Sequence, residues 1–265
     1  MKKALLVGSL GVAVARGHHH SLHPQCRHLI EKFAHPGGPG SLEEGRYDGS
    51  QFFLPVTYSI NGIWYNKDMF DRHGWPLPST WREFLDLCEK IKRTGGGIAP
   101  LTHQGRYPTY FGMIWRALVY KLGGEELVCA LDSLEPAAWQ HPELIRAGYM
   151  CRQLVEMEYI LEGSSAFSHT EAQMIWLQGK AAMIPCGTWL ESEMANALPE
   201  GFEMRIMPVP GFVNGKGGTG AMEANAGPAL WVPRQAAHPE WGMELLRILL
   251  SKKMAANFLR TVGSC

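Results

Sequence analysis

The feature that most constrains the fold of this chain is a regular alternation of strand-like and helix-like segments from residue 51 onward. The run 51–65 is rich in aromatic and β-branched residues, which predicts a strand pair or one long bent strand. Thr80 and Glu83 then form a capping-box pattern, and apolar residues recur at helical spacing after it. A glycine run at 95–97 ends this predicted helix, because glycine tolerates the left-handed conformation of a helix end.

The same alternation continues to the end of the chain. The stretches "KAAMIPCG", "FEMRIMPVP" and "AGPALWVP" are typical of buried strands, and 98–101 predicts a shorter one. Helices are predicted over 110–122, 142–160, 239–250 and from a second capping box at Ser168 and Glu171 to Gly179. In the helix 142–160, the expected inward-facing residues are Leu144, Ile145, Tyr149, Leu154, Val155 and Tyr159. This pattern predicts an α/β fold in which helices cover a sheet.

Composition excludes several kinds of partner. The 265 residues carry 25 basic and 25 acidic side chains, and no block of like charge occurs. A nucleic-acid backbone or an anionic membrane surface is therefore not an expected partner, and a small or neutral ligand is. The six cysteines, of which none forms a CxxC pair, exclude zinc-ribbon and thioredoxin sites; most are expected to be buried thiols, with one disulfide left open.

The first residues resemble an export signal. Lys2 and Lys3 precede an apolar run over 4–15, and Ala13 and Ala15 fit the small-x-small cleavage pattern. The run is too short to span a bilayer, and no lipid-anchoring cysteine follows it directly. We therefore expect an exported protein. The alternative is a buried strand of a truncated chain.

A histidine-rich stretch follows, with the histidines His18, His19, His20, His23, His28 and His35. Imidazoles bind zinc, copper and nickel, so the stretch suggests a metal-binding tail. Three adjacent histidines cannot all reach one ion from an ordered element, and no carboxylate is spaced to orient them. We expect a linker with no specific metal site, and an exported metal-binding protein remains the alternative.

Motifs of catalysis and nucleotide binding are weak or missing. Gly215, Gly217 and Gly220 match GxGxxG, but the residues after them do not form a helical pattern, so a hairpin loop is predicted. Gly179 and Lys180 are followed by alanine, which breaks the phosphate-loop pattern. GxSxG and HExxH do not occur, and no carboxylate pair can be singled out as a glycosidase acid and base. We expect no enzyme and no cofactor, with a secreted glycan-degrading enzyme as the alternative.

Three stretches together resemble a known family. They are "GRYDGSQFFLPVTYSINGIWYNKDMFDRHGWPLPSTWREFLDLCEKIK", "GGGIAPLTHQGRYP" and "AFSHTEAQMIWLQGKAAMIPCGTWLESEM". Their order and spacing are similar to those of extracellular solute-binding proteins of carbohydrate ABC transporters, of the family 1 type. The resemblance implies a two-lobed periplasmic-binding-protein fold of type II and a sugar ligand held between the lobes. It also implies delivery to the permease subunits of an importer, a periplasmic or extracellular location, and a monomer.

The resemblance and the chemistry of sugars together give the candidate site. A pyranose offers an apolar face and a rim of hydroxyls, so its site needs flat aromatic rings and short polar groups. By resemblance, Trp189 is the ring-stacking residue, with a core tryptophan as the alternative. Ser59 aligns with a sugar-contacting position, although many relatives carry a longer polar side chain there. The other candidates are Thr57, Tyr58, Asn61, Tyr107, Tyr110, Glu223 and Asn225, with core tyrosines or a solvated loop as alternatives.

The resemblance also predicts the domain organisation. Residues 1–20 form the signal-like segment and the start of the histidine-rich linker, 21–60 a remnant of lobe one, 61–218 lobe two, and 219–265 the return crossing and partial lobe one. Family members are longer at both ends, so the chain is expected to be truncated, with lobe one incomplete. The signature residues Tyr65 and Asn66 are expected to be structural, with Tyr65 packed inside lobe two and Asn66 capping a turn.

Overall fold

The computed structural model describes residues 45–47 and 50–262. The predicted export segment, the histidine-rich stretch, Cys26 and Cys265 lie outside the described residues. The described chain divides into two compact units: one runs from Ile60 to Glu223, and the other combines the residues up to Ser59 with those from Ala224 onward. The assignment of these units to the lobes of a binding protein stays a prediction.

The first unit is built on a mixed sheet with strand order β5-β6-β4-β7, to which β8 adds by pairing with β4. The strands are β4 (Tyr58–Asn66), β5 (Ala99–Leu101), β6 (Ala181–Gly187), β7 (Met204–Met207) and β8 (Glu223–Ala226). The first two residues of β4 and the last three of β8 belong to the second unit. β4 pairs antiparallel with β6, which sets Asn61 opposite Gly187, whereas β5 and β6 run parallel. All residues of β6 are buried, as the apolar run "AAMIPCG" requires of a central strand.

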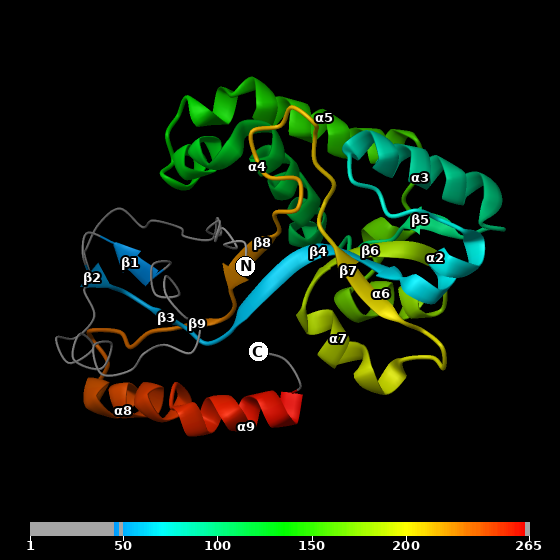
Figure 1. Ribbon diagram of the computed structural model, residues 1–265. Helices are drawn as coiled ribbons and strands as arrows, with labels where there is room; N and C mark the ends of the chain where they lie inside the picture. Colours follow the sequence, from blue (N-terminus) through cyan, green and yellow to red (C-terminus); the bar gives the residue numbers. More distant parts are fainter. Residues whose placement is uncertain (1–44, 48–49, 263–265) are drawn as a thin grey trace. The chain divides into compact units, whose positions relative to one another are not determined.

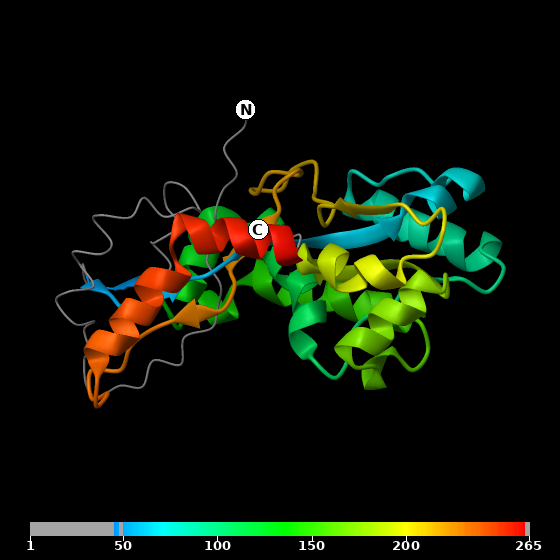
Figure 2. The same ribbon diagram turned by 90° about the horizontal axis from the view of Figure 1, so that it is seen from below.

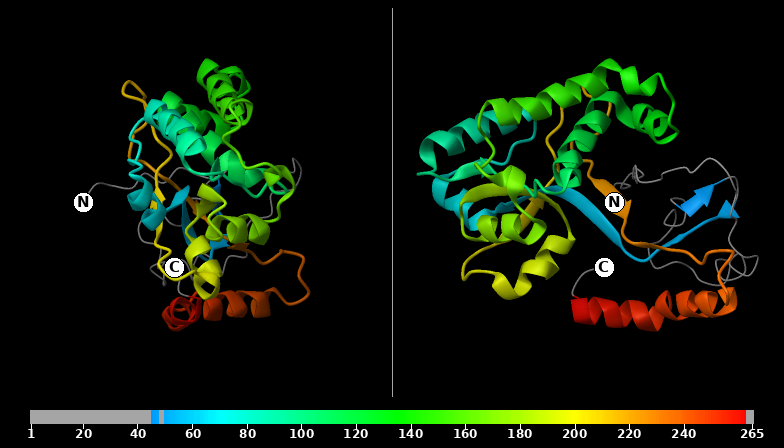
Figure 3. Two further views of the ribbon diagram at one scale, coloured as in Figure 1. Left: turned by 90° about the vertical axis from the view of Figure 1, so that its right-hand side faces the viewer. Right: turned by 180° about the vertical axis from the view of Figure 1, so that it is seen from behind.

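Helices cover both faces of this sheet. The helices of the first unit are α2 (Lys67–His73), α3 (Trp81–Thr94), α4 (Pro108–Asp132), α5 (Pro142–Glu156), α6 (His169–Leu177) and α7 (Trp189–Met194). One core cluster joins Ile63 and Met183 of the sheet to α3, α4 and α5, and a second joins Trp64 and Ile184 to α6 and α7. Figure 1 shows α3 and α5 above the sheet and α6 and α7 below it, and Figures 2 and 3 show the same layers from other sides.

Both predicted capping boxes are present. Thr80 Oγ1 accepts from the backbone N of Glu83, and Glu83 Oε2 accepts from the backbone N of Thr80, each at 3.2 Å. Ser168 and Glu171 make the same reciprocal pair at the start of α6. Tyr65 is buried in the first core cluster, and Asn66 caps α2 by accepting from the backbone N of Met69. The structural role predicted for these two signature residues is confirmed.

Two predicted helices differ from the observed ones. The helix expected to end at Leu122 resumes after Gly124, whose φ of 77° breaks the helical path, and it continues to Asp132. The helix expected to reach Ile160 ends at Glu156. Three residues expected to face inward are exposed: Ile145, Tyr149 and Val155. The buried stripe of this helix consists of Leu144, Ala147, Cys151 and Leu154. The three exposed residues lie one or two positions from the nearest member of the stripe, so their side chains turn toward solvent.

The glycine-rich loop is attached to α4. Lys121 is fully buried, and its Nζ donates to the backbone carbonyls of Gly218, Thr219 and Ala221 at 3.0, 2.8 and 3.0 Å. A Cβ at Gly217 would lie 2.4 Å from the carbonyl oxygen of Tyr120, so the loop needs glycine to approach the helix. The loop is followed by β8 and not by a helix, which confirms that GxGxxG is no dinucleotide motif here.

The described residues of the second unit form two small antiparallel strand pairs and two helices. Its strands are β1 (Arg46–Tyr47), β2 (Ser50–Gln51), β3 (Leu54–Pro55) and β9 (Ala229–Leu230), and its helices are α8 (Pro239–Leu249) and α9 (Lys252–Val262). β3 pairs with β9, and Leu54 packs with Met243 and Leu246 of α8. The single strand predicted for 226–233 is therefore shorter, because the chain leaves the ladder after Leu230.

Candidate functional site

Trp189 begins α7, and only Thr188 separates it from Gly187, the last residue of β6. Its indole lies against the backbone of Gly187, where an added Cβ would be only 2.0 Å from Cζ3 of the ring. The ring is partly buried and packs against the second core cluster. Trp189 is therefore both a core contact and a candidate stacking surface. One part of the indole packs against the core, and the rest of the ring is not covered.

Two tyrosines lie beside this tryptophan. The rings of Tyr110 and Trp189 are 6.2 Å apart at 69°, and those of Tyr107 and Tyr110 are 6.5 Å apart at 66°. Tyr107 is 48% exposed, whereas Tyr110 is half-buried. We call Tyr107, Tyr110 and Trp189 the aromatic platform. The structure thus brings together three of the four aromatic residues that the sequence placed at the site.

Polar groups that the sequence did not single out hold Tyr110. Its hydroxyl is hydrogen-bonded to His169 Nδ1, and His169 Nε2 lies 2.7 Å from Glu193 Oε2. Gln173 Nε2 donates to the same carboxylate oxygen at 2.9 Å. Burial raises the pKa of Tyr110. These partners come from α6 and α7, so local sequence patterns carry no signal for them.

Asn61 and Glu223 form a second polar group in the same unit. Asn61 Nδ2 donates to Glu223 Oε2 at 3.1 Å, and Arg116 Nε donates to Glu223 Oε1 at 2.6 Å. Both members of this ion pair are largely buried. Asn61 Oδ1 is buried with no protein partner among the described residues. Glu223 is therefore already engaged inside the unit through Arg116, a residue that sequence reasoning missed, whereas Asn61 keeps one free acceptor.

The remaining predicted residues belong to the second unit. Ser59 Oγ donates to Asn225 Oδ1 at 2.5 Å, so these two candidates contact each other. The carbonyl oxygen of Thr57 accepts from Gly227 N at 2.7 Å, and Tyr58 is partly exposed. The nine candidates thus fall on both units: Thr57, Tyr58, Ser59 and Asn225 on one, and Asn61, Tyr107, Tyr110, Trp189 and Glu223 on the other.

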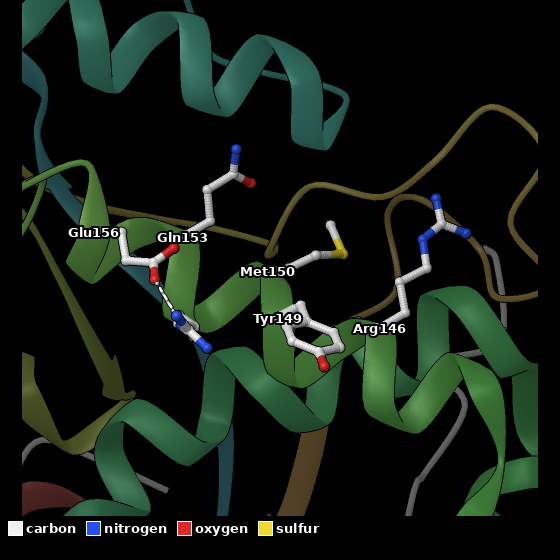
Figure 4. Close-up of a pocket in the computed structure, with 6 residues that line it drawn as sticks. Arg146, Tyr149, Met150, Gln153 and Glu156 are labelled. Carbon is white, nitrogen blue, oxygen red and sulfur yellow. Dashed lines mark hydrogen bonds and ion pairs between the residues drawn. The ribbon is translucent and has the colours of Figure 1, made fainter.

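A shallow groove runs along α5 and does not involve any of the nine candidates. Figure 4 shows its side chains projecting from successive turns of the helix, with the ion pair between Arg152 and Glu156 at one end. The lining residues are Arg146, Tyr149, Met150, Arg152, Gln153 and Glu156. All six come from one helix, and no aromatic pair or buried unpaired polar atom converges on the groove. The aromatic platform is therefore the better candidate site.

Other kinds of site have no support within the described residues. No group of three or more His, Cys, Asp or Glu side chains there is arranged to hold a metal ion. Within the same residues, no helix is both long and apolar enough to cross a bilayer. Cys88, Cys151 and Cys186 are buried free thiols, as predicted, and Cys129 is an exposed one. Burial raises the pKa of Cys151 and Cys186 to about 12, which makes them inert as nucleophiles.

The fold is that of sugar-binding proteins of the type II periplasmic class, as predicted. A solved chitin oligosaccharide binding protein superposes with a TM-score of 0.76 at 22% identity, covering 92% of this chain and 60% of that one. The solute-binding protein RafE in complex with raffinose gives a TM-score of 0.67 at 18% identity, covering 85% and 58%. These likenesses establish the fold.

The family follows from the sequence comparisons. Residues 31–256 match the model for bacterial extracellular solute-binding proteins, and the chain belongs to that family. Diacetylchitobiose binding protein NgcE of Streptomyces coelicolor is 32% identical over 225 residues, which cover 84% of this chain and 48% of the relative. A probable sugar-binding periplasmic protein of Rhizobium meliloti is 30% identical over 161 residues, covering 60% and 38%. The chain spans about half the length of the curated relatives it matches.

The family agrees with three of the predictions. Its members are extracellular, in line with the predicted location outside the cytoplasmic membrane. The named relatives are binding proteins and not enzymes, which supports the prediction of a non-catalytic protein. The family predicted from the sequence motifs, solute-binding proteins of carbohydrate transporters, is confirmed.

Proposed function

We propose that this chain binds a chitin-type oligosaccharide outside the cytoplasmic membrane and delivers it to the permease subunits of an ABC importer. Family membership supports binding as the function, and the names of two similar proteins, one curated and one solved, support the sugar class. The proposal further includes a monomeric protein that does not bind nucleic acid.

The observation that carries this proposal is the aromatic platform at the end of β6. The indole of Trp189 packs against Gly187 and against the ring of Tyr110, so its position is fixed before any ligand binds. A fixed ring loses little conformational entropy when a sugar face stacks on it, and the apolar area removed from water contributes on the order of 2 kcal/mol. Each hydroxyl contact, by comparison, exchanges one water hydrogen bond for another and nets about 1 kcal/mol.

The other candidates are proposed to contact sugar hydroxyls. Asn61 offers a buried acceptor without a protein partner, which suits a hydroxyl donor. Ser59 and Asn225 can each make a further hydrogen bond beside the one that joins them. Thr57 and Tyr58, which precede Ser59, are proposed to contribute a hydroxyl and an aromatic ring to the same contact. Glu223 is proposed as a weaker contact, because its carboxylate already accepts a hydrogen bond from Arg116.

Isothermal titration with diacetylchitobiose, and with raffinose and maltose as comparison sugars, tests the proposal. The parent protein is expected to bind diacetylchitobiose, and Trp189→Ala is expected to weaken binding roughly thirtyfold, because each 1.4 kcal/mol is tenfold. Tyr149→Ala is the matched control: it removes an aromatic side chain that is 64% exposed on α5 and away from the platform. The control is expected to bind like the parent.

Three outcomes would contradict the proposal. No heat of binding with any sugar from a folded parent protein would contradict sugar binding itself. Binding of raffinose or maltose alone would contradict the chitin-type ligand. Equal affinity of the parent and a folded Trp189→Ala variant would contradict the stacking role and favour a purely structural tryptophan.

The assembly state and the two alternative functions need separate measurements. Light scattering is expected to show a monomer, and a stable dimer would contradict that part. Incubation with chitin oligosaccharides, followed by product analysis, is expected to leave the sugar uncleaved; cleavage would favour the glycan-degrading alternative. A divalent-metal titration with and without residues 16–35 tests the metal-binding alternative, which falls outside the described residues.

A further inference from the structure

Four side chains from three helices form a single chain of hydrogen bonds behind the aromatic platform. Tyr110 comes from α4, His169 and Gln173 from α6, and Glu193 from α7. The Tyr110 hydroxyl is bonded to His169 Nδ1, and His169 Nε2 is 2.7 Å from Glu193 Oε2. Glu193 thereby reaches Tyr110 of the platform through one intermediate group, His169.

The direction of every bond in this chain follows from the chemistry of its ends. An ionised carboxylate only accepts, so His169 Nε2 must carry a proton and donate it to Glu193. Gln173 Nε2 lies 3.3 Å from His169 Nε2 but 2.9 Å from Glu193 Oε2, so its shorter hydrogen bond goes to the carboxylate and leaves Nε2 to donate. In neutral His169 the Nδ1 atom is then an acceptor, and the Tyr110 hydroxyl donates to it.

Tyr110 in turn contacts Trp189 directly. Their rings are 6.2 Å apart at an interplanar angle of 69°, an edge-to-face arrangement. The hydrogen bond to His169 fixes the position of the Tyr110 ring, and the ring contact passes this constraint on to the indole. Tyr110 and His169 both donate toward Glu193, and such aligned bonds strengthen one another.

We propose that Glu193 is a positioning residue for the ligand: through His169 and Tyr110 it fixes the orientation of the Trp189 indole on which the sugar stacks. The expected effect of Glu193 on sugar affinity rests on the proposed function, sugar binding at the aromatic platform. Gly187 holds the indole from one side, and Tyr110, which the hydrogen-bonded chain holds in place, limits the rotation of the indole in the remaining space. Glu193 itself is exposed, so it acts on the ligand only through this chain.

The first test needs no sugar. In ¹⁵N spectra of the parent at a pH where His169 is neutral, its imidazole is expected to be protonated at Nε2. His169 is assigned among the 11 histidines by the signal lost in His169→Gln. In Glu193→Gln, whose side-chain amide can also donate, the tautomer is expected to become mixed and the Trp189 indole N–H resonance to shift. Glu191→Gln, the same charge change on the same helix, is expected to leave both signals unchanged.

The second test measures affinity for diacetylchitobiose by titration. Glu193→Gln is expected to weaken binding about fivefold, the effect of one hydrogen bond. Tyr110→Phe breaks the chain at its centre, so adding Glu193→Gln to Tyr110→Phe is expected to cause no further loss. A residue with a merely structural role would instead add its full effect in the double variant.

The outcomes separate the two proposals. If the parent binds no sugar but the tautomer and indole signals change as expected, the proposed function fails and the positioning chain is supported. If the parent binds and Glu193→Gln leaves the affinity, the tautomer and the indole resonance unchanged, the positioning proposal is overturned. Additive losses in the double variant overturn it as well.

Discussion

Gly187→Ala is the change that most directly tests how the structure presents the platform. An added Cβ would lie 2.0 Å from Cζ3 and 2.4 Å from Cε3 and Cη2 of the Trp189 ring. Carbon atoms in ordinary contact are about 3.5 to 4 Å apart, so the indole or the end of β6 must move by about 1.5 Å. The ring cannot simply bend away, because its other neighbours are Tyr110 and the second core cluster.

Two quantities should change together. Overpacking of this size costs about 1 to 3 kcal/mol of unfolding free energy, measured by urea denaturation. Displacement of the indole should also remove the stacking contribution of about 2 kcal/mol, which corresponds to a roughly thirtyfold loss of affinity for diacetylchitobiose. Near-ultraviolet circular dichroism of the aromatic rings reports the displacement itself.

Gly148→Ala is the matched control. Gly148 lies inside α5, and nothing lies within 4 Å of where its Cβ would be. This variant should be more stable by about 0.5 to 1 kcal/mol, because alanine favours the helix over glycine, with unchanged sugar affinity. A Gly187→Ala protein with the stability and aromatic spectrum of the parent would refute the reasoning, since the indole would then not rest on Gly187.

Three further predictions concern the scaffold of the platform-bearing unit. Thr80→Ala should lower the unfolding free energy by about 1 kcal/mol, since it removes one half of the capping box of α3; an unchanged urea midpoint would contradict this. Glu223→Ala should cost about 3 kcal/mol by removing the carboxylate from its largely buried ion pair with Arg116, and a loss below about 1 kcal/mol would show that the pair is not buried in solution. Burial lowers the pKa of Lys121 to about 8, below the 10.5 of an exposed lysine. Between these values the unfolded chain binds more protons, so the stability of the parent relative to Lys121→Met should rise with pH from about 8 to 10.5, by at most about 1.4 kcal/mol per pH unit; a flat difference across that window would contradict it.

Much of the first unit was predictable because its signals are local. A capping box joins residues three apart, so Thr80 with Glu83 and Ser168 with Glu171 predicted the starts of α3 and α6 directly. The continuous apolar run of β6 predicted a central buried strand, and the order of the family motifs predicted the family and the aromatic residues of the candidate site.

The errors have a common origin in packing. Tyr149 and Val155 are as apolar as their buried neighbours on α5, and only the direction from which α4 packs decides which stripe is covered. The helix predicted to end at Leu122 continues beyond the break at Gly124, because Leu127, Val128 and Leu131 of its later turns pack into the first core cluster.

The polar network of the site was decided by tertiary structure alone. Arg116 meets Glu223 across 107 residues, Tyr110 meets His169 across 59, and Lys121 meets the carbonyl of Thr219 across 98. A hydrogen bond needs two atoms within about 3 Å and a suitable angle, and residue identity does not determine either over such separations. The sequence by itself was enough to predict the starts of α3 and α6, the central strand β6 and the aromatic residues of the candidate site. The packing of α4 against α6, α7 and the glycine-rich loop determined which polar groups hold those rings, because only the folded chain brings the atoms within bonding distance.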